Sequence, residues 1–368
     1  MRSLVFVGTY TQPIRFGTGQ ILEGKGDGMY CLELDYSTGK MKKIAEFTGI
    51  DNPSYLTLDK NKKFLYAVNE LKAFEGKEQG AVSAFALSDD AKTLTFLNQR
   101  GTGGTDPCHV VVNRENTHVY VSNFMSGSVC IYPIMPDGSL GEASQFIQHE
   151  GSSINPRRQT GPHAHSLIFD AEEKYAFVPD LGIDKMMTYK TDFVNGTLTP
   201  GDIPWFETFA GAGPRHCVFS PCGSYCYLIN ELASSLSALA YDAKTGGFTL
   251  LQTVPTVVDE SFTTENTCAD VHITPNGRFL YGSNRGHNSI VIYEVDPSTG
   301  MLSYVDTEPC GGEIPRNFAI EETGQIMLVA NQDTDNIVTF AIDQAKGTLT
   351  KLSEIAVPTP VCVKPYRM

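Results

Sequence analysis

Short apolar runs rich in Val, Ile, Tyr and Phe alternate with polar turns along the whole chain. The turns are built mainly from Gly, Asp, Asn and Pro, and apolar residues almost never recur with helical spacing. Runs of this length and composition, bounded by such turns, are typical of β-strands. The pattern therefore predicts an all-β protein.

One strand pattern returns along the chain every roughly 50 residues, which indicates an internal repeat. Each copy ends in Asn or a near equivalent. A strand, an Asp/Gly turn and a further strand follow each copy, and an apolar run, usually opened by Pro, precedes six of them. The seven copies are residues 5–9, 66–69, 120–123, 177–180, 227–230, 281–284 and 328–331.

The seventh apolar run lies at the far end of the chain, at residues 360–363. It supplies the inner strand that the first copy lacks, so the two ends of the chain meet in one sheet. Such circular completion favours a closed ring over an open array of repeats. We therefore predict one seven-bladed β-propeller domain over residues 1–368, with four antiparallel strands per blade and with the C-terminal strand closing the N-terminal blade.

The first strand of each blade starts beside the end of its antiparallel neighbour, so these corners gather on one face around a channel mouth. The long loops 10–28, 70–80 and 149–161 belong to the same face, and loops of this kind usually carry binding residues. One register at the strand starts holds Ser54, Cys108, His165, Arg215, Ala269 and Arg316. The next register holds Tyr55, His109, Ser166, His216, Asp270 and Asn317.

Charge and composition limit the possible partners. The net charge of −14 argues against nucleic acid and anionic membranes but permits a small anionic substrate at a local cationic site. The N-terminal apolar run is too short for a secretory signal, and no run reaches membrane-spanning length. The nine cysteines are scattered, without a C-x-x-C pair, so we expect free thiols in the cytoplasm. A closed propeller exposes few sheet edges, so we expect a monomer.

Several motifs together resemble the lactonase family of seven-bladed β-propellers. This family includes 6-phosphogluconolactonases and a fungal carboxymuconate lactonising enzyme. The resemblance covers essentially the whole chain. The motifs that carry it are Val7-Gly8-Thr9-Tyr10, Gly161-Pro162-His163-Ala164-His165-Ser166, Asp180-Leu181-Gly182, Gly213-Pro214-Arg215-His216, Asn230-Glu231-Leu232 and Asn284-Arg285-Gly286-His287-Asn288-Ser289.

The resemblance implies hydrolysis of a phosphosugar lactone, most directly 6-phospho-D-glucono-1,5-lactone in the pentose phosphate pathway. We expect no metal or other cofactor, because δ-lactones hydrolyse readily. The resemblance also implies a catalytic set of His165 (or its neighbour His163), Arg215, Glu231 and Arg285. All of these positions also fall in the predicted mouth. We expect further substrate contacts there from His109, His163, His216, Glu70, Asp180, Asp270 and Arg316.

Lactone hydrolysis needs a base that activates water, donors for the developing oxyanion, and cations for the phosphate. His165 or Glu231 can serve as the base, and Arg215 or Arg285 can bind phosphate or stabilise the oxyanion. The sequence leaves these roles open. It also leaves open a purely structural role for Glu231, as the ion-pair partner of an arginine.

Three other functions remain possible at this point. A lactonising cycloisomerase would use the same residues on a carboxymuconate-like polycarboxylate. A metal-dependent lactonase would draw oxygen ligands from Glu70, Asp180, Glu231 and Asp270. A propeller can also bind a ligand or protein without catalysis. We expect the repeated Asn anchors to serve strand-end turns, His118 to lie at the surface and His149 in a loop.

Overall fold

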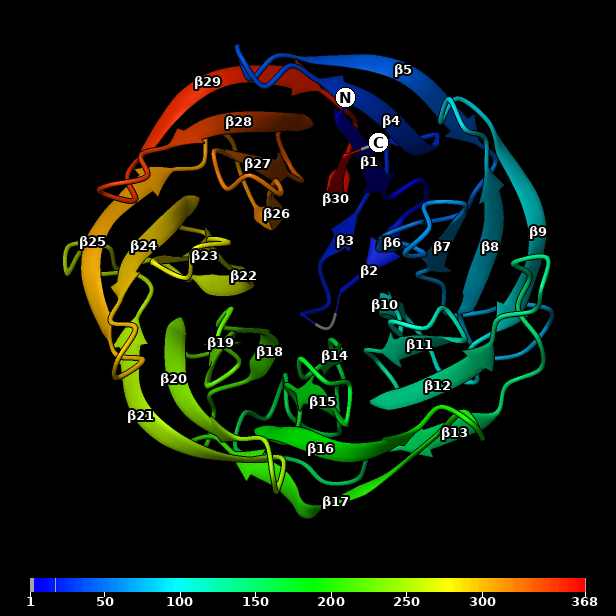
Figure 1. Ribbon diagram of the computed structural model, residues 1–368, viewed down its shortest axis with the longest axis horizontal. Coiled ribbons are helices and arrows are strands. Elements are labelled where there is room, and N and C mark those ends of the chain that lie inside the picture. Colours follow the sequence, from blue (N-terminus) through cyan, green and yellow to red (C-terminus); the bar gives the residue numbers. More distant parts are fainter. Residues whose placement is uncertain (1–2, 17, 368) are drawn as a thin grey trace. The chain divides into compact units, whose positions relative to one another are not determined.

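The structure is a computed structural model that describes residues 3–16 and 18–367. Within these residues it contains thirty strands and no helix, which confirms the prediction of an all-β chain. The strands form seven four-stranded sheets and one two-stranded hairpin (Figure 1). The chain divides into two compact units, so the expectation of a single domain over 1–368 stays a prediction. Unit 1 is Met1–Val7, Leu32–Lys43 and Pro214–Met368, and unit 2 is Gly8–Cys31 and Ile44–Gly213.

Unit 2 holds three complete sheets, each formed by four strands that are consecutive in the sequence. The first is β6 (Leu56–Leu58), β7 (Phe64–Asn69), β8 (Ala81–Leu87) and β9 (Leu94–Gly101). The second is β10 (Pro107–Val112), β11 (His118–Asn123), β12 (Ser128–Pro133) and β13 (Gln145–Gln148). The third is β14 (Ile168–Phe169), β15 (Tyr175–Asp180), β16 (Lys185–Asp192) and β17 (Thr197–Glu207). The hairpin is β2 (Ile14–Arg15) and β3 (Ile21–Leu22).

Unit 1 holds three further complete sheets of the same kind. The first is β18 (Pro214–Phe219), β19 (Tyr225–Asn230), β20 (Ser235–Asp242) and β21 (Gly247–Pro255). The second is β22 (Thr267–Ile273), β23 (Phe279–Arg285), β24 (Ser289–Val295) and β25 (Leu302–Pro309). The third is β26 (Pro315–Ile320), β27 (Ile326–Asn331), β28 (Asn336–Ile342) and β29 (Leu349–Ala356).

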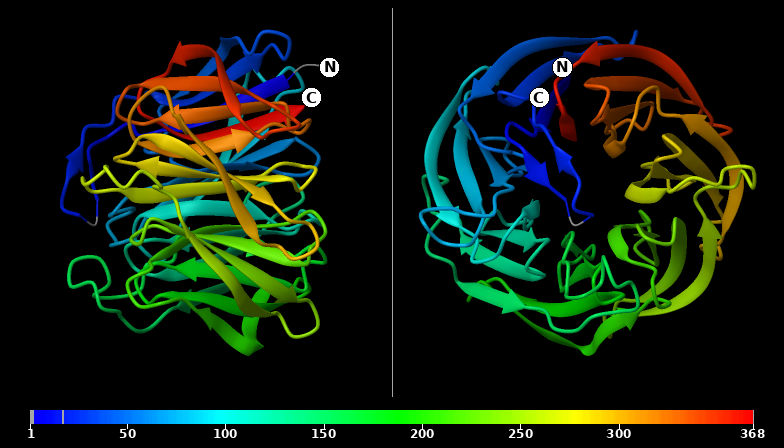
Figure 2. Two further views of the ribbon diagram at one scale, coloured as in Figure 1. Left: turned by 90° about the vertical axis from the view of Figure 1, so that its left-hand side faces the viewer. Right: turned by 180° about the vertical axis from the view of Figure 1, so that it is seen from behind.

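The seventh sheet joins the two ends of the chain. Its strand order is β30-β1-β4-β5, so the C-terminal strand takes the inner place beside the N-terminal strand. This confirms the circular completion that the repeat count predicted. Its strands are β1 (Ser3–Thr9), β4 (Gly28–Leu34), β5 (Met41–Thr48) and β30 (Pro360–Arg367). Figure 2 shows the strands from two further directions.

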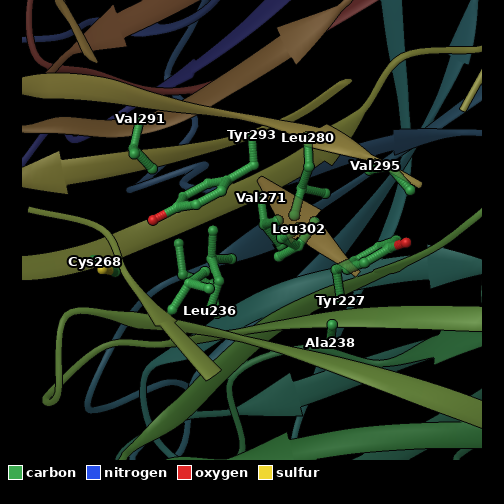
Figure 3. Close-up of a cluster of buried hydrophobic side chains, with 12 residues drawn as sticks. Tyr227, Leu236, Ala238, Cys268, Val271, Leu280, Val291, Tyr293, Val295 and Leu302 are labelled. Carbon is green, nitrogen blue, oxygen red and sulfur yellow. The ribbon is translucent and has the colours of Figure 1, made fainter. Parts of the chain in front are cut away.

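Apolar side chains of neighbouring sheets form continuous cores within each unit. In unit 1, the sheets β18–β21 and β22–β25 share a core to which Leu236 and Leu280 contribute without any exposed surface (Figure 3). Each such side chain contributes about 1.5–3 kcal/mol relative to exposure to water. Burial on both faces explains why the inner strands read as nearly continuous apolar runs.

Tyrosines in the second strand of a sheet form hydrogen bonds with a turn of the following sheet. Tyr227 donates to the Gly300 carbonyl at 3.2 Å, and Tyr281 donates to the Gly347 carbonyl at 2.8 Å. Gly347 has a φ of +76°, and a Cβ there would lie 2.4 Å from Cδ1 of Phe279. The Asp/Gly turns that mark the repeat are therefore required by backbone conformation and by close packing together.

The side chains of the Asn anchors make hydrogen bonds that connect strands to neighbouring loops and strands, rather than only closing the strand-end turns. Their side chains donate to backbone carbonyls in the loops that precede the sheets: Asn69 to Asp51 at 2.7 Å and Asn284 to Thr256 at 2.8 Å. They also bond Ser hydroxyls of the following strands. The surface placement of His118 is wrong, because its side chain is buried at the start of β11 and its Nδ1 lies 2.9 Å from Thr117 Oγ1.

Candidate functional site

The inner strand β18 starts with a β-bulge that holds Arg215. Pro214 pairs with Asn230 and His216 pairs with Ile229, so Arg215 is the extra residue between two regular pairs. The pairing of β10 and of β26 shifts at the equivalent residues, Cys108 and Arg316. A bulge re-aims its side chain out of the regular alternation and is common beside active sites. The ladders thus confirm the predicted register at these strand starts.

Arg215 and Arg285 converge on one carboxylate oxygen in unit 1. Arg215 Nε lies 3.0 Å from Glu231 Oε2, and Arg285 Nη2 lies 2.8 Å from the same atom. Both guanidinium groups also donate to carbonyls of β22, Arg215 to Ala269 and Arg285 to Cys268. The backbone carbonyl of Glu231 accepts from Cys268 N–H at 3.1 Å. These bonds fix the orientation of two guanidinium groups before any ligand binds.

This cluster is buried and rich in positive charge. The side chains of Arg215 and Glu231 are 2% and 4% exposed, and that of Arg285 is 13% exposed. Burial and then the Arg285 charge lower the pKa of Arg215 to about 10, and the nearby charge of Arg316 acts in the same direction. Arg215 therefore stays protonated at neutral pH. Three guanidinium groups near one glutamate favour binding of an anion.

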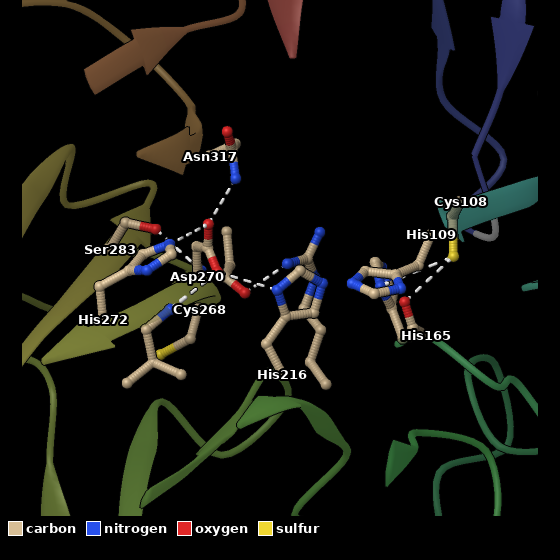
Figure 4. Close-up of polar contacts among 12 residues, drawn as sticks. Cys108, His109, His165, His216, Cys268, Asp270, His272, Ser283 and Asn317 are labelled. Atoms are coloured by element: carbon tan, nitrogen blue, oxygen red, sulfur yellow. Dashed lines mark hydrogen bonds and ion pairs between the residues drawn. The ribbon is translucent and has the colours of Figure 1, made fainter. Parts of the chain in front are cut away.

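A second polar cluster in unit 1 is centred on the buried Asp270 (Figure 4). His216 Nδ1 lies 2.8 Å from Asp270 Oδ1, and His272 Nε2 lies 3.1 Å from Oδ2. Asn317 donates its side-chain N–H to Oδ2 at 2.5 Å, and the backbone N–H of Val271 donates to Oδ1 at 3.0 Å. The carboxylate thus accepts from four neighbours.

Asp270 and His216 of this cluster have opposite preferences for a proton: Asp270 favours the ionised form and His216 the neutral form. Burial alone would raise the pKa of Asp270, but the charges of His272 and His216 and the hydrogen bonds from both rings hold this pKa well below its usual value. Burial and then the charge of Arg215 lower the pKa of His216 to about 4, although Asp270 opposes this shift. At neutral pH the pair is therefore an ionised carboxylate and a neutral imidazole.

The three histidines predicted in unit 2 lie among aromatic and thiol groups. His165 Nδ1 is 3.7 Å from Cys108 Sγ, and its ring meets Phe124 edge-to-face at 5.2 Å between centroids. His163 stacks on Phe124 at 4.8 Å and donates from Nδ1 to the Phe124 carbonyl at 3.0 Å. His109 packs on the Tyr55 ring at 4.4 Å.

The two carboxylates predicted in unit 2 are buried and hydrogen-bonded. Asp180 accepts from the His163 backbone N–H at 2.6 Å, and its Oδ2 lies 2.7 Å from His149 Nδ1. Tyr189 lies 3.0 Å from the other ring nitrogen of His149. His149 lies in the loop after β13, as predicted, but its side chain is buried and supports the segment that carries His163. Glu70 accepts from the Tyr10 hydroxyl at 3.0 Å.

Sequence reasoning missed His272 as a member of the site. It lies two residues after Asp270 on β22 and reaches the same carboxylate. Alternate residues of a strand share a face, so this spacing was a usable signal. The bulge between Cys268 and Val271 disturbs the alternation at Asp270, which limits such counting.

Two further observations concern other possible functions. Within residues 3–16 and 18–367, no three or more His, Cys, Asp or Glu side chains are arranged to hold a metal ion. Two of the four carboxylates considered as metal ligands have other partners: Glu231 forms ion pairs with two guanidinium groups, and Asp270 accepts from imidazole and amide donors. The described residues also include no helix long and apolar enough to cross a membrane.

Residues 4–365 match the family described as "Lactonase, 7-bladed beta-propeller". The chain therefore belongs to the lactonase family of seven-bladed β-propellers. Its seven four-stranded sheets correspond to the seven blades, which confirms the predicted fold class.

The relatives extend over the full chain. It is 36% identical over 360 residues to a 6-phosphogluconolactonase of Bacillus subtilis, covering 98% of this chain and 97% of the relative. A crystal structure of a putative 6-phosphogluconolactonase from Bacteroides fragilis is similar with a TM-score of 0.90 and 34% identity, covering 100% of this chain and 98% of the other. A periplasmic gluconolactonase of Pseudomonas aeruginosa has a TM-score of 0.90 and 29% identity, with coverage of 100% and 99%.

Proposed function

We propose that this protein hydrolyses the cyclic ester of a phosphorylated sugar lactone, most directly 6-phospho-D-glucono-1,5-lactone to 6-phosphogluconate. The observation that carries the proposal is the pair of buried guanidinium groups, Arg215 and Arg285, held in place by Glu231. The names of the relatives from Bacillus subtilis and Bacteroides fragilis support the same substrate class.

The arginines can bind both the negative phosphate of the substrate and the oxyanion that forms during the reaction. A guanidinium group presents parallel N–H donors that match a phosphate or a carboxylate. The same donors stabilise the oxyanion that forms when water adds to the lactone carbonyl. Because Arg215 and Arg285 are already oriented by carbonyls of β22, little reorganisation is needed when the substrate binds.

Glu231 is better suited to hold the arginines than to accept a proton from water. Its Oε2 lies 3.0 Å from Arg215 Nε and 2.8 Å from Arg285 Nη2, so it forms ion pairs with both guanidinium groups. A carboxylate oxygen engaged in this way would have to break a charged contact before it could act as a base. We therefore assign Glu231 the orienting role that the sequence had left open.

The test measures hydrolysis of 6-phosphogluconolactone above its spontaneous rate, beside unphosphorylated glucono-1,5-lactone. We expect catalysis of the phosphorylated lactone, loss of turnover in Arg215→Ala, and wild-type turnover in Arg278→Ala. Arg278 is the matched control because it is an exposed arginine just before β23, 48% accessible and 3.6 Å from Glu294. An absence of any acceleration would contradict the proposal, and cyclisation of a carboxymuconate by the same preparation would assign the chain to the cycloisomerases instead.

We further propose that the protein works as a monomer in the cytoplasm. All nine cysteines are free, and eight of them are buried, which suits a reducing compartment. Sedimentation of the purified protein at micromolar concentration should give the mass of one chain, and a stable dimer would contradict the proposed monomer.

A further inference from the structure

The contacts of Asp270 determine which nitrogen of His216 carries the proton. The buried carboxylate is ionised, so every polar neighbour within hydrogen-bond distance must donate to it. His216 faces it with Nδ1 at 2.8 Å, which places the proton of the neutral ring on Nδ1. The lone pair of the neutral ring is therefore on Nε2.

Asn317 makes this arrangement difficult to reverse. Its Oδ1 accepts from the backbone N–H of Val363 at 2.7 Å, so its amide group cannot be turned around without losing that bond. The Asn317 N–H must then point at Asp270 Oδ2, where it lies at 2.5 Å (Figure 4). His272 donates to the same oxygen at 3.1 Å. A carboxylate fixed by these neighbours holds the His216 ring through one defined bond.

We propose that His216 is the general base of the lactone hydrolysis and that Asp270 is the positioning residue that orients it. This inference rests on the proposed function. His216 Nε2 takes a proton from water while the water oxygen bonds to the lactone carbonyl carbon. When the tetrahedral intermediate collapses, the bond from this carbon to the ring oxygen breaks, and the imidazolium returns the proton to that oxygen. The products are a hydroxyl group and a carboxylic acid, which ionises to release one proton to solvent.

Other candidate bases fit the geometry less well. Glu231 is engaged by two guanidinium groups, and His165 has a cysteine thiol at 3.7 Å from its Nδ1. A base is most effective when a third group fixes its tautomer and supports the positive charge that it gains. The His216 ring has such a group, because the Asp270 carboxylate lies 2.8 Å from its Nδ1.

The charges around His216 influence its basicity in both directions. Arg215 and His272 disfavour its protonated form, and Asp270 favours it. Arg285, Arg316 and Glu231 act on the same cluster through Arg215. An anionic substrate bound at the arginines would offset their charge, which makes His216 a stronger base when the substrate is in place.

The test uses two variants of the full-length protein and one control. His216→Asn keeps an N–H donor towards Asp270 but removes the accepting nitrogen, and Asp270→Asn removes the group that fixes the tautomer. We expect each to lower kcat about 10²–10⁴-fold, with a much smaller change in KM. Asp296→Asn, in an exposed turn after β24 of the same sheet, should keep wild-type kcat.

Nitrogen NMR of histidine-labelled protein provides a readout independent of activity, with the His216 signal assigned by its absence in His216→Asn. We expect a neutral ring with the proton on Nδ1 at neutral pH, and loss of that single tautomer in Asp270→Asn. A His216 ring protonated on Nε2, or on both nitrogens, overturns the inference whatever the activity.

The two proposals fail in different ways. If His216→Asn keeps more than about one tenth of wild-type kcat while Arg215→Ala is inactive, the base is overturned and the lactonase function stands. If the wild-type protein hydrolyses no lactone, the proposed function and the base role both fall, and the NMR result alone decides whether Asp270 positions His216.

Discussion

Replacing Glu231 by Gln tests how the arginine pair is held. The change keeps the size of the side chain and removes its charge. Arg215 and Arg285 would then face each other without the negative charge that now lies 3.0 and 2.8 Å from them. At these distances each attraction is about 5–6 kcal/mol at an effective dielectric constant near 20.

The net loss should be smaller than the sum of the two attractions. The Gln oxygen still accepts one hydrogen bond, and Arg285, at 13% exposed, can recruit water. Breaking a buried ion pair by removing one partner usually costs about 3–5 kcal/mol. We therefore expect Glu231→Gln to lower the free energy of unfolding by about 3–5 kcal/mol, a large part of the 5–15 kcal/mol typical of whole proteins.

Urea unfolding followed by far-ultraviolet circular dichroism measures this loss. The matched control is Glu294→Gln, which removes an exposed ion pair with Arg278 and should cost less than about 1 kcal/mol. The double variant Glu231→Gln/Arg285→Met should recover part of the loss because it removes one of the two unbalanced charges. A loss below about 1 kcal/mol for Glu231→Gln alone would refute the view that this carboxylate anchors the arginines.

Three further predictions concern pH, a turn and metal dependence. The pKa of His216 falls from 6.5 to about 4 on folding, so on acidification the unfolded chain binds a proton before the folded chain does. The free energy of unfolding should therefore decrease by on the order of 3 kcal/mol as the pH falls through this window. Urea unfolding at several pH values should show that this free energy depends less steeply on pH in His216→Asn than in the wild type. Gly347→Ala should lower the melting temperature more than Gly76→Ala. Both glycines have φ near +75°, but of the two only Gly347 has an aromatic ring, that of Phe279, at the position of an added Cβ. Equal decreases in melting temperature would show that this ring moves aside. Treatment with EDTA should leave lactone turnover unchanged, whereas a loss that added calcium restores would show a metal-dependent reaction.

The fold was predictable because the sequence repeats itself. Counting from each Asn anchor identified the strand starts, and the observed bulges at Cys108, Arg215 and Arg316 fall at the predicted positions. The same counting showed that the last strand must join the first sheet. These features depend only on the spacing of residues along the chain, which is visible without a structure.

The chemical roles were not predictable in the same way, because they depend on distances between sheets. Glu231 was equally compatible with a base and with an ion-pair partner until both arginines were found on one of its oxygens. The buried contacts of His149 were not predictable, because its partners, Asp180 and Tyr189, lie far away in the sequence. The burial of His118 was not predictable either, because the sequence of a turn does not show which other sheet packs against it.

The network around Asp270 shows how the repeat produces a site from equivalent positions. His216, Asp270 and Asn317 occupy the same register at the starts of β18, β22 and β26, and Val363 follows in β30. Hydrogen bonds connect them in this order: His216 donates to Asp270, Asn317 also donates to Asp270, and the Val363 backbone N–H donates to Asn317. The repeat therefore supplies the spacing, and only the residue types differ from sheet to sheet. Because the last bond ends on the C-terminal strand, the strand that completes the first sheet also fixes the orientation of the amide that supports the proposed base.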